Sequence, residues 1–250
     1  MTGKKVMESC SKTLKRVTLE LGGNDPAIVT KNVDVETYAP KVADLAFANS
    51  GQVCLALKRV YIHEDIFDQF RDAMVKHVQT LKLGDGTEKD VSHGPIQNSM
   101  QYERVCGFFK DIEKEGWKVA VGGKNDENAP GYFIQPTIID RPADDSRIVT
   151  EEPFGPILPI MSYKTEEEVI ERANNTLMGL GASVWTTDME EAERIGRQLD
   201  AGSVWTNTHL ELQPNLPFGG HKQSGIGHEW GISGLKQFCN VQTLFLKKHI

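Results

Sequence analysis

The sequence has few cysteines and no long apolar run, and each absence excludes a class of protein. Its four cysteines in 250 residues form no Cys-x-x-Cys pair and no zinc-like Cys/His spacing, which excludes a disulfide framework and predicts no metal site. No stretch of 18 apolar residues is present to cross a membrane, and no apolar core follows Lys4 and Lys5 as in a signal peptide. We therefore expect free thiols in a reducing, cytoplasmic setting.

A concentrated basic face is also absent. The chain carries 28 Lys and Arg against 35 Asp and Glu, a formal net charge of −7, which argues against a nucleic-acid partner. Apolar residues make up 39% and charged residues 25%, as in ordinary globular proteins. The length suits one large domain or two small ones with a substantial core.

Strand and helix patterns alternate along the chain. Alternating or continuous apolar residues predict strands at 16–21, 26–30, 59–63, 118–121, 133–139, 157–162, 182–186, 203–207 and 241–247. Helical spacing and capping residues predict helices within 1–15 and at 34–48, 65–81, 99–115, 165–174 and 188–202, with a short one near Leu235. A polar loop is expected at 125–131. The alternation predicts an α/β fold with a largely parallel twisted sheet flanked by helices.

Cys54 ends a small turn, Asn49-Ser50-Gly51-Gln52-Val53-Cys54, which follows the helix predicted at 34–48. Thiolates are nucleophiles, and a tight turn can aim backbone N–H groups at a developing oxyanion. Cys54 is therefore a candidate catalytic nucleophile. The alternative from this residue alone is a buried structural cysteine, because free Cys is among the most buried residue types. His77, on the apolar stripe of a predicted helix, is interpreted as structural.

Five short motifs follow one another along the chain. They are Leu19-Glu20-Leu21-Gly22-Gly23, Asn49-Ser50-Gly51-Gln52-Val53-Cys54, Gly131-Tyr132-Phe133-Ile134-Gln135-Pro136-Thr137, Glu151-Glu152-Pro153-Phe154-Gly155-Pro156 and Pro217-Phe218-Gly219-Gly220-His221-Lys222-Gln223-Ser224-Gly225. In this order, over essentially the whole chain, they resemble the NAD(P)-dependent aldehyde dehydrogenase superfamily. The resemblance implies the catalytic domain of that family, with a C-terminal oligomerisation strand.

The resemblance also implies catalytic roles. Cys54 matches the nucleophile, which attacks the aldehyde carbonyl to give a thiohemiacetal and, after hydride transfer to the nicotinamide, a thioester. Glu20 matches the general base, which activates the water that hydrolyses this thioester. The backbone N–H of Cys54 would supply one oxyanion donor. Glu229 matches a carboxylate behind the active site, with a proton-relay or a structural role.

Cofactor contacts are implied in the same way. Glu152 matches the carboxylate that holds the nicotinamide ribose hydroxyls, and Phe154 matches the aromatic residue beside the nicotinamide. Gln101 and Arg104 match positions of further ribose contacts, and Gly22 lies in the motif next to the cofactor. The cofactor expected is NAD or NADP, and the residue that would choose between them is not in the sequence.

The sequence departs from the family pattern in two places. Leu57-Lys58 replaces the small residues usual between the cysteine and Arg59. In addition, no G-x-G-x-x-G turn is present for the cofactor phosphates, and the asparagine that is the second oxyanion donor is missing. We therefore expect residues 1–22 to be a remnant of the NAD(P)-binding domain, 23–222 the catalytic domain, and 223–250 a return segment with the oligomerisation strand.

Three functions remain open from the sequence. The first is oxidation of a small-molecule aldehyde to a carboxylic acid with NAD(P)+. The second is a catalytically impaired subunit of an oligomer, in which the chain pairs with itself or with a full-length homologue. The third is a cofactor-independent thiol esterase, because Cys54 and Glu20 alone can form and hydrolyse a thioester.

Overall fold

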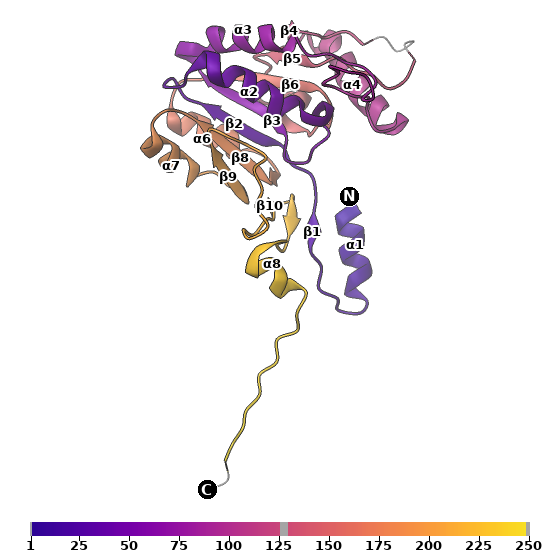
Figure 1. Cartoon of the computed structure of the whole chain (residues 1–250), viewed down its shortest axis with the longest axis vertical. Helices are drawn as coiled ribbons and strands as arrows, with labels where there is room; N and C mark the ends of the chain where they lie inside the picture. Colours follow the sequence, from indigo (N-terminus) through magenta and orange to yellow (C-terminus); the bar gives the residue numbers. More distant parts are fainter. Residues whose placement is uncertain (1, 126–129, 249–250) are drawn as a thin grey trace.

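The computed structural model describes residues 2–125 and 130–248, and within them seven strands form a central sheet. Its strand order is β4-β5-β6-β3-β2-β8-β9 (Figure 1). All neighbours are parallel except β4 and β5, so the largely parallel sheet is confirmed. The strands are β2 (Asp25–Val29), β3 (Leu57–His63), β4 (Val119–Val121), β5 (Thr137–Asp140), β6 (Ile157–Tyr163), β8 (Gly181–Trp185) and β9 (Ser203–Thr206).

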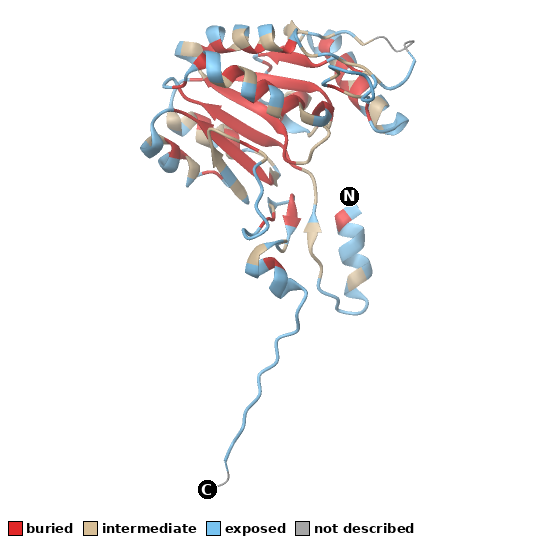
Figure 2. Cartoon of the chain, viewed as in Figure 1, coloured by how far each residue is buried: buried red, intermediate tan, exposed pale blue. Residues whose placement is uncertain are grey.

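Helices cover both faces of this sheet. One face packs on α2 (Val35–Phe47) and α3 (Phe67–Val78). The other packs on α4 (Ser99–Glu115), α6 (Glu166–Asn174) and α7 (Met189–Gly196). Successive strand residues point to opposite faces, which explains why β2 and β3, covered on both sides, are buried almost throughout (Figure 2). The sheet therefore lies between two apolar cores, one on each face.

Several helix boundaries follow from capping residues. The helix predicted at 99–115 forms as α4, where the side chain of Asn98 accepts from the N–H of Gln101 and Gly116 ends the helix with a φ of 66°. Thr165 accepts from the N–H of Glu168 at the start of α6, so the predicted capping box is confirmed at that bond.

Two helices end earlier than the apolar pattern predicts. The helix expected at 65–81 begins as a 3-10 turn, η2 (Glu64–Ile66), and ends at Val78. The one expected at 188–202 ends at Gly196, because the next N–H groups, from Gln198 and Leu199, bond three residues back and tighten the chain into a turn.

Smaller elements lie away from the central sheet, below it in Figure 1. They are α1 (Thr2–Ser11), the pair β1 (Leu19–Glu20) and β11 (Gly225–Ile226), the pair β7 (Met178–Gly179) and β10 (His221–Lys222), and α8 (Gly231–Gln237). The short helix α5 (Arg147–Thr150) lies instead beside β6 of the sheet. The strand predicted at 16–21 is thus only two residues long, because its partner β11 offers only two. The proposed boundaries at 22 and 222 stay predictions.

The strand predicted at 241–247 is wrong for this chain. Residues 241–248 form no strand, and they run away from the fold with every side chain exposed (Figures 1 and 2). Val241, Leu244 and Phe245 are 92%, 74% and 89% exposed. A strand needs a partner edge, and no other described segment lies beside this one. Residues 126–129 of the predicted polar loop and residues 1, 249 and 250 lie outside the described residues.

Among the described residues, no helix has the length and apolar character that crossing a bilayer requires. Within the same residues, no group of three or more His, Cys, Asp or Glu side chains is arranged to hold a metal ion. His77 of α3 lies 2.6 Å from a carboxylate oxygen of Asp44 in α2, which supports its interpretation as a structural residue.

Candidate active site

The turn that carries Cys54 has an unusual backbone. Directly after α2, the 3-10 segment η1 (Ala48–Gly51) contains three successive residues with positive φ, namely Asn49 at 50°, Ser50 at 57° and Gly51 at 72°. At Gly51 a Cβ would lie 2.3 Å from the carbonyl oxygen of Gly155. Only glycine fits this approach, which brings the turn against the loop that follows Glu152.

Cys54 and Glu20 meet, although β1 and the turn are far apart in sequence. The Cys54 Sγ lies 3.7 Å from the Glu20 Oε1 and donates to it. Glu20 faces the thiol because its neighbour Leu19 points to the other side of β1, as the alternation predicted. A carboxylate at this distance can accept the proton of the thiol or of a water placed beside it.

The surroundings of both groups favour their protonated forms. Burial and, to a lesser extent, the Glu20 carboxylate raise the pKa of the Cys54 thiol to about 11, although Lys58 acts in the opposite direction. The N–H of Leu55 points at the sulfur and also favours the thiolate. Burial raises the pKa of Glu20. The hydrogen bond from Cys54 lowers this pKa, and the negative charge of Glu229 raises it.

One oxyanion donor is available at the nucleophile. The backbone N–H of Cys54 makes no hydrogen bond within the part of the chain that the structure describes. It is therefore free to donate to an oxygen that gains charge when the sulfur adds to a carbonyl carbon.

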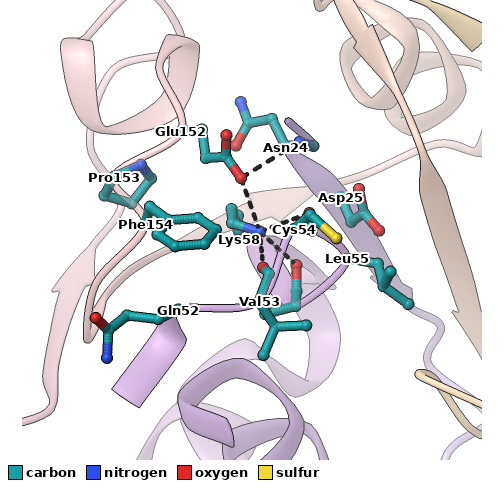
Figure 3. Close-up of polar contacts among 12 residues, drawn as sticks. Asn24, Asp25, Gln52, Val53, Cys54, Leu55, Lys58, Glu152, Pro153 and Phe154 are labelled. Carbon is teal, nitrogen blue, oxygen red and sulfur yellow. Dashed lines mark hydrogen bonds and ion pairs between the residues drawn. The ribbon is translucent and has the colours of Figure 1, made fainter. Parts of the chain in front are cut away.

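Glu152 lies beside Lys58, close to the turn that carries Cys54 (Figure 3). Its Oε1 accepts from the N–H of Gly23 and from the Nζ of Lys58, each at 3.3 Å. Burial raises the pKa of Glu152, and the ammonium of Lys58 lowers it. A Cβ on Gly22 would lie 2.4 Å from the Oε2, so glycine at this position leaves the carboxylate in place.

A groove of about 450 Å³ opens beside this carboxylate. It runs between α1, β1 and β11, and its lining includes Gly3, Leu21, Gly22, Glu152, Met178 and Gln223. The predicted cofactor residues Gly22 and Glu152 thus share one depression on the same side of the site.

Gln101 and Arg104 of α4 hold the Glu152 loop from behind. The Nε2 of Gln101 donates to the carbonyl oxygens of Pro153 and Phe154, both at 3.0 Å. A guanidinium nitrogen of Arg104 donates to the carbonyl oxygen of Glu152 at 2.8 Å. The structure therefore brings both predicted residues to the site as supports of the loop, and their direct contact with a cofactor stays a prediction.

Phe154 has a φ of 51°, a conformation that non-glycine residues rarely adopt. Such backbone strain persists only where surrounding contacts enforce it, and here the two bonds from Gln101 bracket the residue. The loop thus holds Phe154 in a fixed conformation beside Glu152.

Two features of the site were not identified from the sequence. From the sequence, Lys58 is only a departure from the family pattern, although a lysine at the start of a buried strand is itself a sign of a buried charge. The second is the buried pair Asp25 and His209, whose Oδ2 and Nε2 are 3.4 Å apart. The same Nε2 lies 2.8 Å from the carbonyl oxygen of Leu55, directly after the nucleophile.

Known proteins resemble this arrangement. The model of the aldehyde dehydrogenase family matches residues 1–244. Aldehyde dehydrogenase LUC3 of Fusarium sp is 40% identical over 248 residues, which cover 99% of this chain and 53% of the relative. The mitochondrial aldehyde dehydrogenase of Leishmania tarentolae is 42% identical over 243 residues, or 97% of this chain and 49% of the relative.

A solved structure agrees with these relatives. The NAD+ complex of an aldehyde dehydrogenase from Bacillus cereus matches with a TM-score of 0.91 at 40% identity, and it covers 95% of this chain and 48% of that protein. The chain thus spans about half the length of the curated relatives it matches. Since the family model covers almost every residue and the fold agrees over the same span, this chain belongs to the aldehyde dehydrogenase family.

Proposed function

We propose that this chain carries the nucleophile and the general base of an enzyme that oxidises an aldehyde to a carboxylic acid with NAD+ or NADP+. The observation that carries the proposal is the 3.7 Å contact between the Cys54 Sγ and the Glu20 Oε1. Two motifs that the sequence singled out separately supply these two side chains. Their contact gives the nucleophile a base within reach.

In the proposed reaction, Glu20 accepts the thiol proton and the sulfur of Cys54 adds to the aldehyde carbon to form a thiohemiacetal. The N–H of Cys54 donates to the oxygen that becomes negative. The nicotinamide, when bound, supplies the acceptor for the hydride that this carbon loses. Glu20 releases the thiol proton to solvent and, again as a carboxylate, takes a proton from the water that attacks the thioester; the carboxylic acid leaves and the proton on Glu20 returns to the sulfur to restore the thiol.

The residues beside the thiol fit the nicotinamide-ribose end of the cofactor. Glu152 offers carboxylate oxygens to ribose hydroxyls, Gly22 leaves them room, and Phe154 offers an aromatic ring to the nicotinamide. Solved relatives, including the Bacillus cereus enzyme, are NAD+ complexes. The sequence has no G-x-G-x-x-G turn for the phosphates, so the fit in this chain is limited to that end.

A direct assay tests the proposal. The chain is mixed with an aliphatic or aromatic aldehyde and NAD+ or NADP+, and the absorbance of the reduced cofactor is followed. Activity that disappears in Cys54→Ala supports the proposal for this chain. No reduced cofactor with any aldehyde means that the chain is not an autonomous dehydrogenase.

A cofactor-independent thiol esterase is a second candidate. The same contact between Cys54 and Glu20 favours it, because acyl transfer to sulfur and hydrolysis of the thioester require no hydride acceptor. Hydrolysis of an activated ester that is lost in Cys54→Ala supports this function. The two candidates differ in whether NAD(P)+ is consumed.

A role as an oligomer subunit is favoured by a different observation. The exposed segment 241–248 carries four large apolar side chains, which are Val241, Leu244, Phe245 and Leu246. Such a segment fits the edge of a sheet in another chain, either a second copy or a full-length homologue. Co-purification with a longer homologue supports the second partner.

Cytoplasmic location also stays a prediction. The relative from Leishmania tarentolae is described as mitochondrial, so relatives of similar identity need not share one compartment. Fractionation of cells that express the tagged chain decides between the two compartments.

A further inference from the structure

Lys58 is a buried lysine in the middle of the candidate active site. Its side chain is 3% exposed and belongs to β3, which is buried along nearly its whole length. A lysine is rarely buried unless its ammonium group is paired, because removal of the charge from water is costly. The partners of Lys58 therefore show what the charge is used for.

Four oxygens surround the ammonium group (Figure 3). The Nζ donates to the carbonyl oxygens of Val53 at 2.6 Å, Cys54 at 2.9 Å and Ala56 at 3.4 Å. The fourth oxygen is the Oε1 of Glu152 at 3.3 Å. Three of these acceptors thus belong to the turn that carries the thiol, and one belongs to the loop on the cofactor side.

We propose that Lys58 is a positioning residue that joins the nucleophile turn to Glu152 and serves as a counter-charge for the Cys54 thiolate. The proposal rests on the proposed function for the roles of Cys54 and Glu152. It goes further in assigning a task to a residue that departs from the usual family pattern.

The three carbonyl bonds fix the turn. Its positive-φ residues cost conformational energy, and a single cation bound to the carbonyl oxygens of Val53, Cys54 and Ala56 offsets part of that cost. Lys58 thereby holds the backbone of Cys54 in the position from which its sulfur contacts Glu20.

The bond to Glu152 pairs the ammonium group of Lys58 with a carboxylate on the cofactor side of the site. Lys58 acts to lower the pKa of Cys54, whereas Glu20 acts to raise it. Because Glu152 neutralises part of the lysine charge, any change that weakens this carboxylate strengthens the action of Lys58 on the sulfur. Hydroxyl groups that hydrogen-bond to the Glu152 carboxylate would likewise strengthen the action of Lys58 on the sulfur.

The charged or titratable groups around the thiol are Glu20 of β1, Lys58 of β3, Glu152 of the loop before β6, Asp25 of β2, His209 after β9 and Glu229 after β11. A test changes Lys58 or Glu152 one at a time and leaves the other groups in place. Among these groups of the described chain, Lys58 is the cation that acts on the sulfur.

The rate of alkylation of Cys54 by iodoacetamide, measured against pH, tests the proposal. The parent chain carries Cys10→Ser and Cys239→Ser, which removes the other accessible thiols, and the modified peptide is quantified by mass spectrometry. The rate follows the thiolate fraction, so its midpoint gives the thiol pKa without substrate or cofactor.

We expect Lys58→Met to raise the midpoint and to slow alkylation at pH 8 by about three- to tenfold, the effect of a nearby charge in a partly hydrated site. We expect Glu152→Gln to lower the midpoint and to speed alkylation. Lys164→Met, which removes an exposed lysine paired with Glu64, should leave the profile of the parent unchanged. Circular dichroism establishes that each variant is folded.

Opposite shifts in Lys58→Met and Glu152→Gln support the proposal. A Lys58→Met profile within twofold of the parent overturns it, as does a Glu152→Gln profile that is unchanged or shifted upward. If Lys58→Met does not fold, the Glu152→Gln profile decides alone. A chain with opposite shifts that never reduces NAD(P)+ refutes only the proposed function, whereas an active chain with unchanged profiles refutes only the role of Lys58.

Discussion

At the residue scale, the reactive group is a thiol that rests in its protonated form. Burial, together with the charge of Glu20, raises the pKa of Cys54 to about 11. At pH 7 the thiolate is then roughly one molecule in ten thousand. The proposed catalysis therefore requires a base next to the sulfur, and Glu20 lies in hydrogen-bond contact with it.

The raised pKa also predicts how stability depends on pH. In the unfolded chain the thiol has its ordinary pKa of 9.0, whereas in the folded chain the pKa is about 11. Between these values the unfolded state binds fewer protons, so stability falls as pH rises. Because the thiol is only half-buried, solvent screening limits this loss to about 1 kcal/mol.

Urea unfolding at pH 8.5 and at pH 10.5 measures this loss, with Cys54→Ser as the comparison. We expect the wild-type chain to lose more stability than the variant between these two conditions, since other groups titrate equally in both chains. An equal loss in both chains would show that the thiol pKa is not raised by folding.

Gly51 gives a prediction about the shape of the turn. Gly51→Ala places a Cβ 2.3 Å from the carbonyl oxygen of Gly155 at a φ of 72°. We expect it to lower the free energy of unfolding by about 2–4 kcal/mol, because both the contact and the backbone conformation oppose a side chain.

Gly86→Ala is the matched control for that variant, since no atom lies within 4 Å of its Cβ position and the residue is exposed. We expect its free energy of unfolding, measured in urea, to stay within about 0.5 kcal/mol of the wild type. Equal stabilities for the two variants would contradict the close approach of the turn to Gly155.

At the scale of elements, α4 acts as a support for the cofactor-side loop. Its first turn is fixed by Asn98, and the next residues place Gln101 against the carbonyl oxygens of Pro153 and Phe154. Gln101→Leu removes both hydrogen bonds and leaves two carbonyl groups without a donor. We expect a loss of about 1–2 kcal/mol in the free energy of unfolding.

Thermal and urea unfolding measure that loss, and Glu103→Gln on the exposed side of the same helix is the control. A Gln101→Leu variant as stable as Glu103→Gln would mean that the side chain does not hold the loop. In that case its only role would be the direct cofactor contact expected from the motif.

The sequence predicted elements best where local chemistry decides them. Thr165 marks the start of α6, and α4 has the predicted bounds because its apolar spacing agrees with the caps that Asn98 and Gly116 form. The contact between Cys54 and Glu20 was expected from motifs. In contrast, the four bonds of Lys58 depend on a turn of three positive-φ residues, which no pattern of apolar residues encodes.

At the scale of the whole molecule, the fold has a well-packed sheet and an exposed terminal segment. Strand propensity at 241–247 could be read from the sequence, but its partner could not, because pairing requires an edge that the chain does not place beside it. The strand predicted at 241–247 is therefore absent because of its tertiary context, and its local strand preference was not misjudged.

Deletion of residues 241–250 tests this description. The described part of that segment packs on no core, so we expect the free energy of unfolding to remain within about 0.5 kcal/mol of the complete chain. We also expect sedimentation velocity to show less self-association, because four exposed apolar side chains are removed. Loss of folding, or unchanged association, would contradict the description of this segment as an unpaired contact surface.

The most direct test of the central claim, that Cys54 is a nucleophile served by Glu20, needs neither an aldehyde nor a cofactor. The chain and its Glu20→Gln variant are treated with p-nitrophenyl acetate, and the acetyl group is located and followed by peptide mass spectrometry. We predict that it forms on Cys54 in both and persists about 100-fold longer in the variant, which lacks the base for thioester hydrolysis. Acetylation at other residues, or equal lifetimes in the two chains, would contradict the claim.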